Sequence, residues 1–242
     1  MPKPLLNAAL GLALALCSAQ ALALEGNAGT LGFVAGGGQG GDLLGDKSNY
    51  YYAYLGTYYE TTKLAGPMSW RFGALALDFQ GIWFLQSVQS GQAIDPQILH
   101  LMEISLMAGP SFNVGLPGEW WLWDGPQLGL GFENAGRGRP QLVLQNELMF
   151  GRGFFSTYWK IDLRVKPDGA LDMRYLAGQV FFRVRQWLAF GPELRFQTSQ
   201  PSAGLMAQVG DDRPRQYWNL TAGCTFDGTV GAQWHLDLWF AL

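Results

Sequence analysis

Charged residues are scarce in this chain, in which Asp, Glu, Lys and Arg together supply 14% of the 242 residues. Typical soluble domains carry about 25%. The shortage argues against a soluble β-sandwich, which normally has many Lys and Glu side chains on its solvent face. The small negative net charge of −3 argues against nucleic-acid binding, because a phosphate backbone attracts a basic surface.

Cysteine and long apolar runs are also lacking. Cys17 lies in an N-terminal apolar segment, so Cys224 is the one cysteine expected in the mature chain and forms no internal disulfide. After residue 23 there is no stretch of about 18 apolar residues, so the sequence predicts no transmembrane helix. No CxxC or HExxH motif is present, and we expect neither a metal ion nor another cofactor.

Residues 1–23 have the features of a cleaved secretory signal peptide. Lys3 supplies a positive charge, 5–16 are apolar, and Ala21-Leu22-Ala23 fits the small-x-small cleavage pattern. An uncleaved anchor helix is the alternative, but the apolar run is short for a membrane span. We therefore expect an exported protein whose mature part, residues 24–242, is one domain.

Aromatic residues and glycine are abundant. Aromatics make up 14% of the chain, with ten Trp, and there are 33 Gly, yet the mean hydropathy is only +0.03. This combination is typical of transmembrane strands that have one apolar face and one polar face.

The segment 155–165 alternates strictly between two such faces, which is a strand period and not a helix period. One face holds Phe155, Thr157, Trp159, Ile161, Leu163 and Val165, and the other holds Ser156, Tyr158, Lys160, Asp162 and Arg164. The last segment, 233–242, places Trp234, Leu236, Leu238, Phe240 and Leu242 on one face. It resembles the C-terminal signal that barrel-assembly machinery reads on outer-membrane proteins, although Leu242 stands where that signal usually has an aromatic.

We therefore predict an all-β fold, a transmembrane antiparallel up-and-down β-barrel of about twelve strands in the bacterial outer membrane. Ten strands remain an alternative, because 29–36 and 203–209 have the weakest patterns. The other expected strands are 49–60, 68–88, 98–114, 125–133, 141–150, 154–166, 172–185, 187–197, 215–226 and 229–241. An even count puts both termini in the periplasm. We expect the barrel to contact outer-membrane lipid and lipopolysaccharide.

Two further segments carry specific expectations. Residues 36–41 are almost entirely glycine and are predicted to form a flexible surface loop. Trp120, Trp121 and Trp123 fall at the predicted periplasmic rim, where they suit an aromatic girdle; a packed aromatic core cluster is the alternative.

Charged residues on the inferred inner faces are the candidate site. Buried charges are costly unless they pair or meet water, so these residues either line a narrow wet channel or pair across the interior and plug it. Arg164, Arg183, Arg185 and Arg195 come from consecutive strands and could form a basic ladder, or they could join salt bridges with the acidic residues. The lumen-lining candidates are Glu103, Glu147, Lys160, Asp162, Arg164, Arg183, Arg185, Glu193, Arg195, His235 and Asp237.

His235 and Asp237 lie two apart on one strand face. A lumen-facing hydrogen-bonded pair is the ordinary interpretation. A catalytic role would need a third partner such as Ser105 or Ser156, which nothing in the sequence demands.

The stretch 101–112, with Met102-Glu103-Ile104 at its start, resembles the Met-Glu-Ile strand of nucleoside-specific outer-membrane channels (the Tsx-like family). The Tyr-rich segment 50–60 and the Asn-Glu segment 142–150 lie in a similar order. The resemblance implies a twelve-stranded barrel of the channel class, and we carry over no nucleoside-binding residues from it.

The function predicted from these observations is a narrow diffusion channel for small hydrophilic solutes. A non-conducting barrel that anchors or scaffolds an envelope or export assembly is the second hypothesis, and a lipid-modifying barrel enzyme is the third. Bilayer conductance separates the first two.

Overall fold

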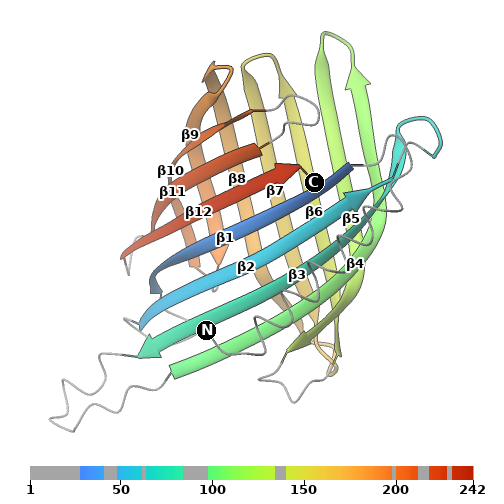
Figure 1. The fold of residues 1–242 in the computed structure, drawn as a ribbon. Helices are drawn as coiled ribbons and strands as arrows, with labels where there is room; N and C mark the ends of the chain where they lie inside the picture. Colours follow the sequence, from blue (N-terminus) through green and yellow to red (C-terminus); the bar gives the residue numbers. More distant parts are fainter. Residues whose placement is uncertain are drawn as a thin grey trace, which may run out of the picture.

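The computed structural model describes residues 28–40, 48–61, 64–83, 98–133, 140–197, 200–211, 218–227 and 231–241. The predicted signal peptide and Leu242 lie outside these ranges. Twelve antiparallel strands form a closed barrel (Figure 1), which confirms the predicted fold and strand number. The strands are β1 (Ala28–Gly40), β2 (Ser48–Glu60), β3 (Met68–Trp83), β4 (Ile98–Leu116), β5 (Trp120–Glu133), β6 (Pro140–Arg152), β7 (Phe155–Val165), β8 (Leu171–Arg185), β9 (Leu188–Gln197), β10 (Gln200–Asp211), β11 (Trp218–Asp227) and β12 (Gly231–Ala241).

Each strand pairs with its neighbours in sequence, and β1 closes the ring by pairing with β12, as Thr30 opposite Ala241 illustrates. The start of β1 and the end of β12 therefore lie at the same end of the barrel, which we call the terminal end; the opposite end is the loop end. Short turns at 117–119, 153–154 and 186–187 connect strands at the terminal end. Among the described residues there is no helix long and apolar enough to cross a membrane.

The two faces of the strands differ as the sequence predicted. On β7, Trp159 is 40% exposed while its neighbour Lys160 is 5% exposed. On β12, Trp234, Leu236 and Leu238 are exposed, while Gln233 and His235 are buried. A closed barrel satisfies its backbone hydrogen bonds internally, as a membrane-spanning structure must. Its outward surface of apolar side chains suits contact with lipid. The chain is a transmembrane β-barrel of the kind found in bacterial outer membranes.

Two segments are more regular than their sequences suggested. The prediction of a loop from residue 36 is wrong for Gly36–Gly40, which continue β1; Gly36 pairs with Tyr52 on one side and with His235 on the other. Partners on both sides supply ladder hydrogen bonds that offset the poor strand propensity of glycine. The weak segment 203–209 is part of β10, for the same reason.

Gly-Pro pairs interrupt the ladders inside strands. The register between β4 and β5 stops at Ala108–Leu128 and resumes at Phe112–Asp124, a gap that contains Pro110 and Pro126. A Cβ atom at Gly109 would collide with the carbonyl oxygen of Pro126. Proline cannot donate to a ladder, and glycine permits the close approach, so these pairs mark bends within strands.

Candidate solute pathway in the barrel interior

The first interior cluster is centred on Glu147 of β6. Arg71 of β3 donates Nη1 to Glu147 Oε2 at 2.8 Å, and Lys160 Nζ lies 3.2 Å from Oε1. Gln145 Nε2 and the hydroxyl of Tyr58 on β2 also donate to Oε1, at 3.1 and 3.3 Å. Strands β2 and β3 are not neighbours of β6, so these contacts pass through the interior.

The second cluster is centred on Arg164 of β7. Its Nη2 lies 2.6 Å from Glu103 Oε1 on β4, and its Nη1 contacts Asp162. Ser105 donates its hydroxyl to the same Glu103 oxygen at 2.6 Å. All four side chains are buried, with residue exposures of 1–7%. Because β4 and β7 are not adjacent, Arg164 bridges the lumen.

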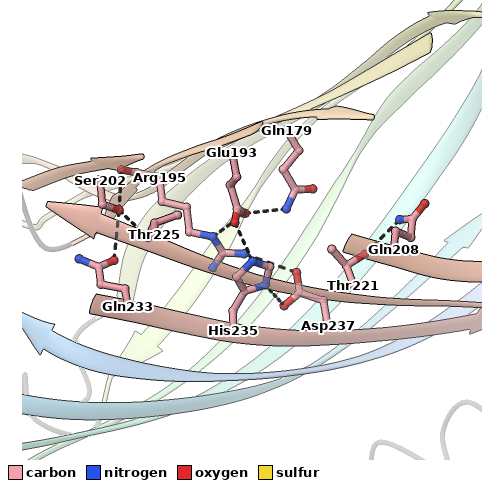
Figure 2. A network of polar contacts seen from close by, with 10 residues as sticks. All are labelled: Gln179, Glu193, Arg195, Ser202, Gln208, Thr221, Thr225, Gln233, His235 and Asp237. Carbon is pink, nitrogen blue, oxygen red and sulfur yellow. Dashed lines mark hydrogen bonds and ion pairs between the residues drawn. The ribbon is translucent and has the colours of Figure 1, made fainter. Parts of the chain in front are cut away.

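The third cluster joins β8, β9 and β12 (Figure 2). His235 Nε2 lies 2.8 Å from Glu193 Oε2, and Nδ1 lies 3.0 Å from Asp237 Oδ1. Arg195 donates Nε to Glu193 Oε1 at 2.7 Å, and its Nη2 is 3.6 Å from Asp237 Oδ2. Gln179 of β8 donates to Glu193 Oε1 at 2.7 Å. The pair predicted from spacing, His235 with Asp237, is thus part of a larger network.

Polar contacts continue on both sides of this cluster (Figure 2). Ser202 and Thr225 share a hydrogen bond of 2.9 Å, and Ser202 also lies 3.4 Å from Gln233 Oε1. Nearer the terminal end, Gln208 Nε2 donates to Thr221 Oγ1 at 3.0 Å. These bonds join the inner face of β10 to those of β11 and β12, so this part of the inner wall is held by side chains as well as by the backbone.

A cavity of about 460 Å³ lies between the clusters and the terminal end. Glu147, Lys160 and Asp237 line it where it meets the first and third clusters, and residues at the ends of strands line its mouth. Its walls combine aromatic rings, among them Tyr158, Tyr175 and Trp239, with amide and hydroxyl groups. Such a mixture is typical of small-molecule sites.

The predicted site residues separate into two groups. Glu103, Glu147, Lys160, Asp162, Arg164, Glu193, Arg195, His235 and Asp237 take part in the three clusters. Arg183 lies at the terminal end, where Nη1 donates to the carbonyl oxygen of Gln186 at 2.7 Å and the residue lines the cavity. Arg185, the last residue of β8, is exposed beside the 186–187 turn, and the register shifts between Arg183 and Arg185.

The four arginines do not form the basic ladder considered from the sequence. Arg164 and Arg195 are paired with carboxylates inside, while Arg183 and Arg185 sit at the end of β8. The alternative, salt bridges with acidic residues, is what the structure shows for Arg164 and Arg195.

The tryptophan girdle prediction needs a correction. Trp121 and Trp123 line the cavity, so they face inward. Trp120 stacks on Phe150, with ring centroids 4.7 Å apart. β5 begins at Trp120, earlier than predicted, and strand alternation therefore divides these three rings between the two faces.

The sequence analysis missed Arg71 and Tyr58. The Arg71 guanidinium lies 3.8 Å from the centroid of Tyr58 and 4.8 Å from that of Trp123. The sequence did contain a signal for Arg71, which lies between the aromatic residues Trp70 and Phe72. These two are exposed on the outer face, so the two-residue period of a strand directs the Arg71 side chain inward.

The serines considered as catalytic partners lie apart from His235. Ser105 binds Glu103 and Arg164 in the second cluster, and Ser156 lines the cavity. Both ring nitrogens of His235 face carboxylates. The described part of the chain holds no group of three or more His, Cys, Asp or Glu side chains placed to bind a metal ion.

Comparison with known proteins supports the fold. No family model and no curated protein sequence matches the chain. Among solved structures, the COG4313 outer membrane channel from Pseudomonas putida F1 superposes with a TM-score of 0.55 at 8% identity, covering 91% of this chain and 97% of that one. Two further solved structures are also similar. The KdgM porin in complex with oligogalacturonate has a TM-score of 0.47 at 9% identity, covering 88% of this chain and 99% of that one. The β domain of the Bordetella autotransporter BrkA has a TM-score of 0.45 at 11% identity, covering 90% of this chain and 100% of that one.

Proposed function

We propose that this barrel is a narrow diffusion channel for small hydrophilic solutes. The observation that carries the proposal is the interior itself, which holds ion pairs, amides and hydroxyls beside a cavity of about 460 Å³. A barrel that served only as a membrane anchor needs no polar cavity. The structural neighbour from Pseudomonas putida, described as an outer membrane channel, agrees with this class of function.

The three clusters are the narrow part of the proposed path. Arg71–Glu147, Arg164–Glu103 and His235–Glu193 each cross between strands that are not neighbours. A solute that enters the cavity has to pass between these pairs to reach the loop end. We therefore expect a small conductance and exclusion of large solutes.

Planar-bilayer recording of the purified, folded chain tests the proposal. Discrete current steps in wild type support a channel, and their absence in repeated insertions would overturn it. In the variant Glu103→Ala/Arg164→Ala, which removes both partners of one bridge, we expect larger steps than in wild type.

The same bridges favour one alternative, a non-conducting barrel that scaffolds an envelope assembly. Buried pairs such as Arg164–Glu103 fill the interior on the loop side of the cavity. Under this alternative wild type shows no steps, while the Glu103→Ala/Arg164→Ala variant shows them.

Membership of the Tsx-like family, which the segment 101–112 suggests, stays a prediction. The resemblance carries over the barrel architecture and the channel class, and it assigns no solute.

A further inference from the structure

Four inward aromatic rings near the terminal end lie against glycines. Trp239 faces Gly32 across the β1–β12 ladder, and a Cβ atom at Gly32 would collide with the indole. Tyr58 lies against Gly73 in the same way, where a Cβ atom would come within 2.9 Å of Tyr58 Cε1.

The other two rings repeat this arrangement. A Cβ atom at Gly151, opposite Trp121, would lie 2.7 Å from Trp121 Cζ2. One at Gly125 would lie 2.6 Å from Trp123 Cη2. Glycine therefore lets each ring fold back against the wall, and all four rings line the cavity.

Arg71 occupies the space between two of these rings. Its guanidinium lies 3.8 Å from the centroid of Tyr58 and 4.8 Å from that of Trp123. Trp121, which is 37% exposed, and Trp239 remain as ring surfaces beside the cavity. The result is an aromatic wall whose rings come from β2, β5 and β12, with Arg71 of β3 between two of them.

The facing wall, from β7 to β11, offers hydrogen-bonding groups among apolar side chains. Gln179, Gln208 and Thr221 line it together with Tyr158 and Tyr175. The Gln208 amide nitrogen donates to Thr221, which leaves the amide oxygen to accept a hydrogen bond. A ligand between the walls meets aromatic rings on one side and hydrogen-bonding groups on the other.

Charges at the base of the cavity are matched within the protein. Glu147 accepts from both Arg71 and Lys160, and Asp237 contacts His235 and Arg195. Glu60 and Arg183 also line the cavity, so its wall holds three carboxylates and three cationic side chains and has no formal net charge. A neutral ligand therefore needs no counter-charge there.

From these features we propose that the cavity is a saccharide-binding subsite on the solute path, an inference that rests on the proposed channel function. A sugar ring presents an apolar face of C–H groups, which packs on an indole, and a rim of hydroxyls that both donate and accept hydrogen bonds. The volume of about 460 Å³ lies within the roughly 300–1,000 Å³ of small-molecule sites.

Calorimetric titration of the folded barrel in detergent micelles with maltose tests the inference. We expect saturable binding of maltose, weaker binding of the open-chain polyol sorbitol, and weaker binding of adenosine and of anionic glucuronate. Trp239→Ala is expected to lower the maltose affinity about tenfold. Trp234→Ala, on the outward face of the same strand, is expected to leave it unchanged.

Trp121→Ala is the second variant, since Trp121 is partly exposed and its loss disturbs less packing than the loss of Trp239. Absence of saturable maltose binding, equal binding of sorbitol, or tighter binding of adenosine or glucuronate would overturn the saccharide site. A maltose affinity that is unchanged in both folded variants, Trp121→Ala and Trp239→Ala, would also overturn the saccharide site.

The recordings described above separate this inference from the channel proposal. Current steps without maltose binding contradict the saccharide site alone. Maltose binding without current steps contradicts the channel and leaves a sugar-binding barrel.

Discussion

Arg164 shows how single residues determine the interior of this barrel. It is 4% exposed and contacts two carboxylates, of Glu103 and Asp162, which are 3% and 7% exposed. A buried charge without a partner is costly, whereas a fully paired group is tolerated. The pairing therefore stabilises the carboxylates and holds β4 and β7 at a fixed distance across the lumen.

Substituting Arg164 by Gln is expected to lower the free energy of unfolding by about 3–5 kcal/mol, because it leaves two buried carboxylates without a cation. Urea unfolding in lipid vesicles, followed by tryptophan fluorescence, measures the change. Exposed Arg185→Gln is the matched control, expected to change stability by less than about 0.5 kcal/mol. Equal effects of the two substitutions would contradict the assigned role of Arg164.

Partners of this kind could not be identified from the sequence. Period two placed Glu103, Glu147 and Arg164 on inner faces, but which of them meet depends on how the twelve strands stagger when the ring closes. The same limitation hid Glu193 as a partner of His235, because 42 positions separate them. Face assignment was predictable; contacts across the lumen were not.

At the scale of the strand, alternation was the reliable signal. It located β7 and β12 almost to the residue, because their outward apolar and inward polar side chains differ sharply. It failed at Gly36–Gly40, where there are hardly any side chains to alternate, and at Trp120–Trp123, where consecutive aromatics conceal the period. In both places neighbouring strands supply the pairing that decides the structure.

A charge on the lipid face of β12 is expected to be costly according to its depth. Leu236 is exposed near the centre of the strand, so Leu236→Arg is expected to destabilise the barrel by about 2–4 kcal/mol. Leu171, exposed at the first position of β8, provides the matched control, and Leu171→Arg is expected to cost about 0–1 kcal/mol.

Urea titration of both variants in lipid vesicles gives the comparison. If Leu171→Arg lowers the free energy of unfolding as much as Leu236→Arg or more, the placement of Leu236 near the middle of the membrane and of Leu171 near its edge is contradicted.

At the scale of the whole molecule, the barrel has two unlike halves. The cavity with its aromatic wall lies toward the terminal end, and bridging clusters such as Arg164–Glu103 lie toward the loop end. Under the proposed function, solutes would meet the cavity first and then the part of the interior that the ion pairs cross. The central claim is that solutes travel through this interior.

Thiol labelling during bilayer recording tests that claim most directly. In a Cys224→Ser background, Gln208→Cys places a thiol in the cavity wall, and Ala207→Cys places one on the exposed outer face of the same strand. A charged, water-soluble methanethiosulfonate is predicted to reduce the current through Gln208→Cys and to leave that through Ala207→Cys unchanged. An unaltered current in Gln208→Cys, with labelling verified by mass, would contradict a path through the barrel interior.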